Sequence, residues 1–238
     1  KEIKINLKKD NSLEIFKINL WSKIIRPRAN FNFSLFENEL TIKGQNNTFK
    51  DTTLIWAESV NIKTPPESSL ISKIYSIKPN LIPYEKEIEL GIALNKNKFP
   101  KHASIYYFNE KHSTWNYMPS VFNIDSTFLL TTILSGESFA ILNENNPPQI
   151  SALMPGINST YFASDIKHIS FIIEDDLAGI DAEKDISVEL NGKRVIFEYN
   201  SYQKKVRYPL KNRLDIGSNE LYIEARDKVG NVTIKKGI

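Results

Sequence analysis

Two acidic stretches near the end of the sequence carry the residues that could bind a metal ion. Residues 174–181 and 227–231 each read as a short loop between apolar strands. Their aspartates are Asp175, Asp176, Asp181 and Asp227. Calcium takes about six to eight oxygen ligands, mostly carboxylates and carbonyls, so these four residues are candidate calcium ligands. Aspartates also cap backbone N–H groups in tight loops. Because the D-x-D/N-x-D/N-G calcium loop is absent, capping is the favoured interpretation and calcium the alternative.

A cluster of aromatic residues over 106–117 could bind a different kind of ligand. Exposed aromatic rings often stack on sugar rings, which makes this segment a candidate carbohydrate site. The candidate ligand-binding residues are Tyr106, Trp115 and Tyr117. Alternation along a strand sends about half of such rings inward. Core packing is therefore the favoured interpretation, and sugar binding remains the alternative.

Catalysis has little support in the sequence. The chain has no cysteine and only three histidines, so thiol nucleophiles, disulfides and cysteine-ligated zinc are excluded. Ser201 and Lys204 match the letters S-x-x-K, but the companion motifs of that chemistry are missing. We expect no enzyme activity and no cofactor from this chain, apart from the calcium alternative.

The charge and hydropathy of the sequence argue against a nucleic-acid-binding protein and against a membrane-spanning one. The net charge is +3, and lysine outnumbers arginine 25 to 6. Nucleic-acid readers rely on the planar fork of arginine, so we expect no nucleic-acid partner. The longest apolar runs are a few residues, such as 139–142. A bilayer needs about 20, so we expect no transmembrane segment.

The elements that must position these residues are strands. Apolar and polar residues alternate with a period of two, and turn residues recur about every 8 to 12 positions, which favours β-sandwiches. The clearest alternating segments are 3–7, 31–35, 40–42, 88–92 and 221–225. The sequence predicts an all-β protein of tandem antiparallel sandwich modules, with a C-terminal module of the immunoglobulin-like kind.

Proline clusters mark the expected boundaries. Pro65–Pro66 and Pro147–Pro148 interrupt the strand pattern, and proline pairs cannot continue a ladder. We therefore divide the chain into a β-rich N-terminal region, 1–146, and a module over 147–238. The N-terminal region could hold two sub-modules, 1–64 and 70–145, or one shared sandwich. Periodicity leaves that choice open.

The region from residue 147 onward has the clearest pattern of predicted strands. Seven predicted strands fall within about 90 residues, the count of an immunoglobulin-like sandwich. They are 149–153, 166–174, 186–190, 194–199, 204–209, 219–226 and 231–236. Asn191–Gly192 suits a two-residue type I′ turn, which places Glu189 opposite Arg194, Val188 opposite Val195 and Ile186 opposite Phe197. In an immunoglobulin-like order the two acidic loops lie at the same end of the module.

These strings also resemble a known class of module. E-D-D-L-A-G-I-D at 174–181, V-E-L-N-G-K at 188–193 and the A-R-D-K-V-G-N closing segment at 225–231 are similar to the bacterial immunoglobulin-like modules of exported and surface proteins. The preceding aromatic segments more weakly resemble the β-rich part of C-terminal tails in exported lysostaphin-like zinc endopeptidases. The zinc ligands of those enzymes have no counterpart here. The resemblance implies an extracellular or cell-envelope location.

Together these features predict a non-catalytic role. The chain begins Lys1-Glu2-Ile3 and is expected to be an excised piece of a longer polypeptide. We expect an accessory, spacer or adhesion-type region that positions a partner domain of the same polypeptide at the cell envelope. The alternative is a carbohydrate- or cell-wall-binding module. A surface protein or a cell-wall glycan would then be the external partner.

Overall fold

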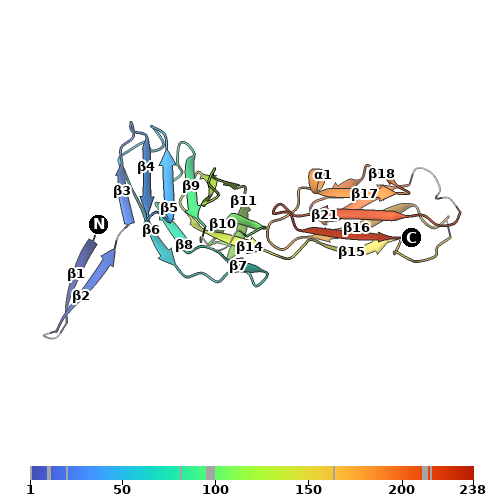
Figure 1. The fold of residues 1–238 in the computed structure, drawn as a ribbon, viewed down its shortest axis with the longest axis horizontal. Coiled ribbons are helices and arrows are strands. Elements are labelled where there is room, and N and C mark those ends of the chain that lie inside the picture. The colour runs from blue at the N-terminus through green and yellow to red at the C-terminus, as the bar shows by residue number, and fades with distance from the viewer. Residues whose placement is uncertain are drawn as a thin grey trace. The chain divides into compact units, whose positions relative to one another are not determined.

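The protein folds into antiparallel β-sheets, as the alternating pattern predicts (Figure 1). The computed structural model describes residues 2–9, 12–19, 21–80, 82–94, 100–162, 164–210, 214 and 216–238. Among these residues the one helix is a four-residue turn, α1 (Ala182–Asp185). No described helix is long and apolar enough to cross a membrane. The chain divides into an N-terminal unit, Lys1–Asn143, and a C-terminal unit, Glu144–Ile238.

The N-terminal unit contains a hairpin and two larger sheets. The hairpin pairs β1 (Glu2–Lys9) with β2 (Ser12–Asn19). The first sheet has the order β11-β10-β14-β8-β6-β3, with β7 paired to β14; its strands are β3 (Trp21–Ile25), β6 (Thr53–Val60), β7 (Ser68–Leu70), β8 (Ile74–Lys78), β10 (Ala103–Asn109), β11 (Thr114–Met118) and β14 (Ser138–Glu144). The second has the order β12-β13-β9-β5-β4; its strands are β4 (Phe31–Leu35), β5 (Leu40–Gly44), β9 (Ile88–Ala93), β12 (Val121–Phe122) and β13 (Phe128–Ile133).

Strands from before and after Pro65–Pro66 share both sheets of the N-terminal unit. In the first sheet β6 pairs with β8, and Ala57 lies opposite Ile77. In the second, β5 pairs with β9, and Ile42 lies opposite Leu90. Residues 21–64 and 70–143 therefore build one sandwich rather than two sub-modules.

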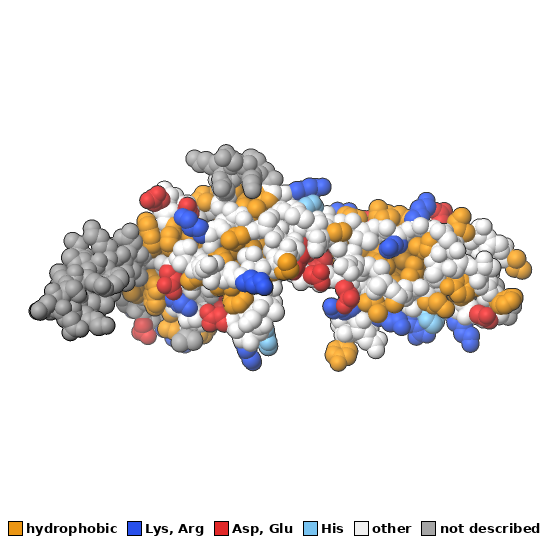
Figure 2. All heavy atoms as spheres, turned by 90° about the horizontal axis from the view of Figure 1, so that it is seen from below, with side chains coloured by type: hydrophobic (Ala, Val, Ile, Leu, Met, Phe, Trp, Pro, Cys, Tyr) orange, Lys and Arg blue, Asp and Glu red, His pale blue; other side chains and the backbone are white. Residues whose placement is uncertain are grey.

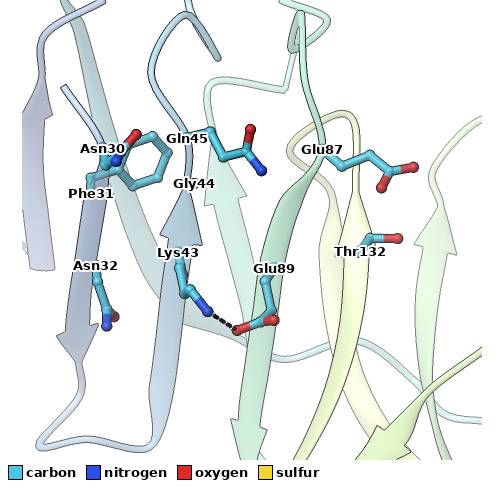
Figure 3. A pocket seen from close by; sticks show the side chains of 9 residues that line it. All are labelled: Asn30, Phe31, Asn32, Lys43, Gly44, Gln45, Glu87, Glu89 and Thr132. Atoms are coloured by element: carbon cyan, nitrogen blue, oxygen red, sulfur yellow. Dashed lines mark ion pairs between the residues drawn. The ribbon is translucent and has the colours of Figure 1, made fainter. Parts of the chain in front are cut away.

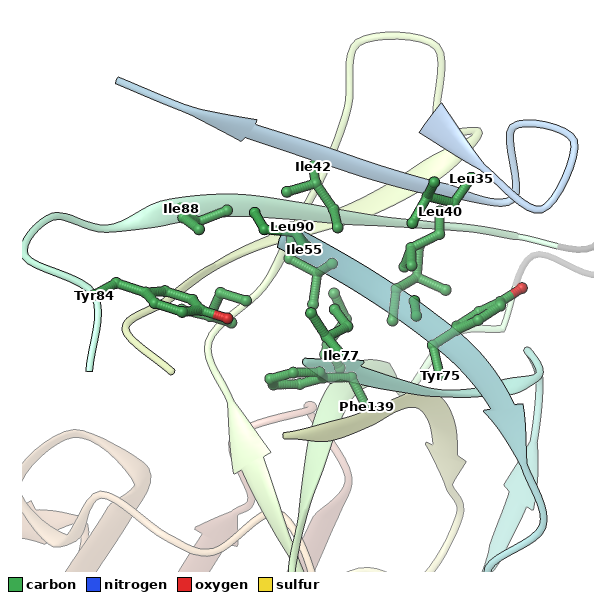
Figure 4. Packing of buried hydrophobic residues seen from close by; sticks show 14 of the residues in the cluster. Leu35, Leu40, Ile42, Ile55, Tyr75, Ile77, Tyr84, Ile88, Leu90 and Phe139 are labelled. Carbon is green, nitrogen blue, oxygen red and sulfur yellow. The ribbon is translucent and has the colours of Figure 1, made fainter. Parts of the chain in front are cut away.

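The core of the N-terminal unit lies between these two sheets (Figure 4). In β5, Leu40 and Ile42 are buried while Lys43 is exposed, so the period of two sorts the side chains between core and solvent. Ile55 from β6 and Phe139 from β14 approach from the opposite sheet. Each fully buried aliphatic or aromatic side chain contributes about 1.5–3 kcal/mol.

The C-terminal unit is a second pair of four-stranded sheets. One has the order β15-β16-β20-β19, from β15 (Gln149–Met154), β16 (His168–Glu174), β19 (Glu198–Asn200) and β20 (Lys205–Pro209). The other has the order β18-β17-β21-β22, from β17 (Ile186–Leu190), β18 (Lys193–Arg194), β21 (Leu221–Arg226) and β22 (Val232–Gly237). One apolar cluster joins Phe171 of the first sheet to Val188 and Ile223 of the second.

The predicted Asn191–Gly192 hairpin forms, but its second strand is shorter than predicted. Both turn residues have positive φ, 51° and 71°, and Glu189 lies opposite Arg194. The strand predicted over 194–199 is interrupted, because β18 ends at Arg194 and Glu198 already pairs with Arg207 of the other sheet. The predicted pairing of Ile186 with Phe197 is therefore wrong. Ile186 instead lies opposite Ala225 of β21.

The described surface mixes charges of both signs. On the face shown in Figure 2, both basic and acidic side chains are exposed. Among the residues drawn on this face neither sign forms a continuous patch.

Candidate functional site

Three carboxylates from separate segments converge within the C-terminal unit. One oxygen from each of Glu144, Asp175 and Asp227 lies within 4.8 Å of the other two. Glu144 ends β14 and is the first residue of this unit. Asp175 follows β16, and Asp227 follows β21. We call these three residues the acidic cluster.

The turn between β21 and β22 holds Asp227 firmly. Its Oδ1 accepts hydrogen bonds from the backbone N–H of Val229 at 3.0 Å and of Asn231 at 2.8 Å. Its Oδ2 accepts from the Asn231 side-chain amide at 2.7 Å. Asp227 is 1% exposed, so these donors replace water around the carboxylate.

The loop after β16 wraps around Asp175 in a similar way. Oδ2 of Asp175 accepts from the backbone N–H of Leu177 at 3.3 Å and of Gly179 at 2.6 Å. Gly179 has a φ of +77°, a conformation that favours glycine and closes the loop on the carboxylate. Its carbonyl accepts from the Lys228 N–H at 3.0 Å, which joins the two acidic loops.

Glu144 connects the beginning of the unit to both loops. Its Oε2 accepts from the Ala178 N–H at 3.0 Å, and its backbone carbonyl accepts from the Asn231 side-chain amide at 3.2 Å. The residue is 0% exposed. Charged residues are almost never fully buried unless their charge is compensated.

One carboxylate of the acidic cluster, Asp175, has a perturbed pKa. Burial raises the pKa of Asp175 above its usual value. Hydrogen bonds from Gly179 and Leu177 oppose the rise in this pKa, while the charges of Asp227 and Asp176 increase it. A Cβ placed on Gly179 would lie 3.4 Å from Lys228 Nζ, so a lysine ammonium lies beside the loop.

The acidic cluster differs from the predicted calcium set. Asp175 and Asp227 belong to it, whereas Asp176 and Asp181 do not. The Asp176 side chain is exposed. Asp181 pairs with Lys184 at 3.5 Å, and its N–H donates to Asp185 Oδ2 at 2.9 Å.

Sequence reasoning missed Glu144. It lies two residues after the apolar run 139–142, as an ordinary polar residue before a proline pair. The only local signal is its position at the border between the two regions. Its partners lie 34 and 87 residues further along the chain.

Two of the three candidate sugar-binding aromatics are buried, in keeping with the favoured core-packing interpretation. Tyr106 is 0% exposed and Trp115 is 7% exposed. The Trp115 indole N–H donates to the Lys63 carbonyl at 3.0 Å, and Tyr117 packs edge-on against Tyr106 at 5.9 Å between ring centroids. Tyr106 and Trp115 therefore offer little surface for stacking against a sugar.

A polar groove lies on the outer face of the sheet β12-β13-β9-β5-β4 (Figure 3). Asn32, Lys43, Glu89 and Thr132 lie side by side on four neighbouring strands. Lys43 and Glu89 form an ion pair at 3.5 Å. The hollow has a volume of about 500 Å³, and its rim includes Asn30, Gln45 and Glu87. Sequence analysis did not identify this groove, because each residue alone reads as an ordinary solvent-facing position.

Comparison with known proteins gives no family assignment. No family model and no curated protein matches this chain.

Proposed function

We propose that this chain is a non-catalytic accessory region of a larger exported bacterial protein. It acts as a spacer or adhesion-type region that positions other domains of the same polypeptide at the cell envelope. One observation carries the proposal: the chain forms two successive compact β units, each with its own apolar core. Such serial units are suited to holding neighbouring domains apart, because each has a hydrophobic core of its own.

The C-terminal unit supports the immunoglobulin-like part of the proposal. Its two four-stranded antiparallel sheets share one core, which is the layering of a β-sandwich. The acidic loops after β16 and β21 meet, as expected for an immunoglobulin-like strand order. We therefore interpret residues 144–238 as a module of this kind.

The spacer role is tested in a polypeptide that carries this region. Replacing residues 1–238 with a Gly/Ser linker of equal length should leave activity on a small soluble substrate unchanged. Activity or adhesion on intact cell wall should fall, because a flexible linker does not fix the separation between domains. Full retention on intact wall, or loss on the soluble substrate, would contradict the proposal.

A second candidate function is glycan binding through the polar groove. Amide, carboxylate and hydroxyl groups from four strands line one hollow, and sugar hydroxyls need such partners. A glycan array and a peptidoglycan pull-down with the 238-residue chain test this function. Lys43→Ala should then abolish binding, while Lys50→Ala serves as the matched control, since Lys50 pairs with Glu85 outside the groove. No binding by the unmodified chain would reject the glycan function and favour the spacer.

A further inference from the structure

We propose that the acidic cluster, Glu144, Asp175 and Asp227, binds one calcium ion that fastens the start of the C-terminal unit to two of its loops. This site differs from the predicted set by the inclusion of Glu144 and the exclusion of Asp176 and Asp181. It does not depend on the proposed function, because either a spacer or a glycan-binding module could contain it.

The separation of the oxygens fits a single ion. Calcium–oxygen distances are about 2.3–2.6 Å, so ligands on opposite sides of one calcium are about 5 Å apart. The three carboxylates have oxygens within 4.8 Å of one another. Three carboxylates can provide three to six of the oxygens that calcium needs, with water or carbonyls completing the set. Magnesium demands a smaller and more regular octahedron and keeps more of its water.

A second observation concerns the oxygen atoms of Glu144. Its Oε2 is engaged by the Ala178 N–H, which anchors the side chain in the loop that carries Asp175. Its Oε1 is also buried but accepts no hydrogen bond from the described residues. A buried carboxylate oxygen normally has a hydrogen-bond donor or a cation as its neighbour. The buried Oε1 atom is therefore evidence for a ligand within the acidic cluster.

Backbone donors alone leave the charge of the cluster in place. The N–H groups of residues 177–179, 229 and 231 orient the carboxylates, but they supply only partial positive charge. The Lys228 ammonium beside Gly179 is the competing cation. A divalent ion supplies twice the charge of this ammonium and can contact all three carboxylates together.

Binding of this ion should stabilise the C-terminal unit alone. Its ligands come from positions 144, 175 and 227, which only the folded chain brings together, so the free energy of binding adds to that of folding. All three tryptophans, Trp21, Trp56 and Trp115, lie in the N-terminal unit. Tryptophan fluorescence therefore reports the N-terminal unit, and calorimetry of the same chain reports both.

The experiment is a thermal melt of the 238-residue chain in chelator, in calcium and in magnesium. Calcium at about a hundredfold excess over Kd should raise one calorimetric transition by several degrees, the equivalent of about 2.7 kcal/mol. The transition seen by tryptophan fluorescence should not move. Magnesium should produce a smaller rise. Equal midpoints in calcium and chelator would overturn the proposal.

Variants locate the site. Glu144→Gln and Asp175→Asn should each remove the calcium-dependent rise, whereas the matched control Asp176→Asn should keep it. Asp227 is left intact because it also holds its own turn. Calorimetry in chelator verifies that each variant folds. An undiminished rise in both Glu144→Gln and Asp175→Asn would overturn the proposal.

Replacing the competing cation gives an independent test. Lys228→Met should destabilise the chain in chelator and increase its affinity for calcium, measured by isothermal titration calorimetry. If Lys228→Met is equally destabilising with and without calcium, the ammonium alone compensates the cluster and the proposal fails.

Discussion

The indole N–H of Trp115 donates a hydrogen bond to the backbone carbonyl of Lys63, 52 residues earlier in the chain, at 3.0 Å. This bond ties β11 to the segment just before Pro65–Pro66. It is one of the contacts that make residues 21–64 and 70–143 a single unit. Trp115 thus has a structural role, although its residue type suggests a sugar platform.

Two substitutions at Trp115 should reduce the free energy of unfolding by different amounts. Trp115→Phe retains an aromatic ring but leaves the Lys63 carbonyl without its donor, which should cost about 1–3 kcal/mol. Trp115→Ala also removes the buried ring and should cost about 3–5 kcal/mol. Urea unfolding followed by circular dichroism measures both. Unchanged stability of Trp115→Ala would show that the ring is not part of the core.

Glu39 should titrate below its usual range. The hydrogen bond from Lys73, at 2.7 Å, is the main cause of the lowered pKa of Glu39; burial opposes it, and the Tyr75 hydroxyl at 2.9 Å adds to the lowering. A lowered pKa gives stability that is present above the unfolded value, about 4.3, and is lost as pH falls through the folded value. Lys73→Met should move the pKa of Glu39 upward in an NMR titration, while Lys23→Met should leave it unchanged.

The pKa of Asp175 predicts the opposite pH dependence. Because burial and the charges of Asp227 and Asp176 raise it, the folded state binds the proton more tightly than the unfolded state. In chelator, the stability contributed by Asp175 should rise as pH falls through the raised pKa towards the unfolded value of about 3.9. Asp175→Asn should remove this dependence. Calorimetry between pH 7 and pH 4 measures it, and an identical pH profile for variant and parent would contradict the assignment.

Gly136 should tolerate no side chain. A Cβ at this position would lie 2.3 Å from the Ile77 carbonyl oxygen and 2.5 Å from that of Pro79. Backbone atoms cannot rotate away, so Gly136→Ala should cost about 1–3 kcal/mol. Gly156→Ala, whose nearest contact is a serine hydroxyl at 3.3 Å, should cost less. Chemical unfolding of the two variants compares them, and equal losses would contradict this explanation.

The sequence predicts most of what local periodicity controls. The strand pattern and the Asn191–Gly192 turn depend on neighbouring residues, and both appear in the structure. The change of sheet after Arg194 could not be predicted, because residues 195–197 are all apolar and read as a continuing strand while the backbone leaves β17.

Long-range contacts limited prediction of the candidate site. Alternation says that half of the aromatic rings point inward but not which half, so the burial of Tyr106 and Trp115 emerges only from the packed sheets. Glu144 reaches the acidic cluster through partners in two distant loops. Only the aspartates of those loops carried a local signal.

The hydrogen bond between Glu144 and Asn231 also affects the order in which the two units can fold during synthesis. A ribosome adds about 5–20 residues per second, so the 87 residues that separate this pair take roughly 4–17 s to make. The N-terminal unit can complete its sheets during that interval, since all its strands precede Asn231. The C-terminal unit must wait, because Pro148 also accepts its hydrogen bond from Thr233, 85 residues later. Its first strand, β15, therefore leaves the ribosome well before β22. The contacts that complete the unit come from Asn231, just before β22, and from Thr233 within it.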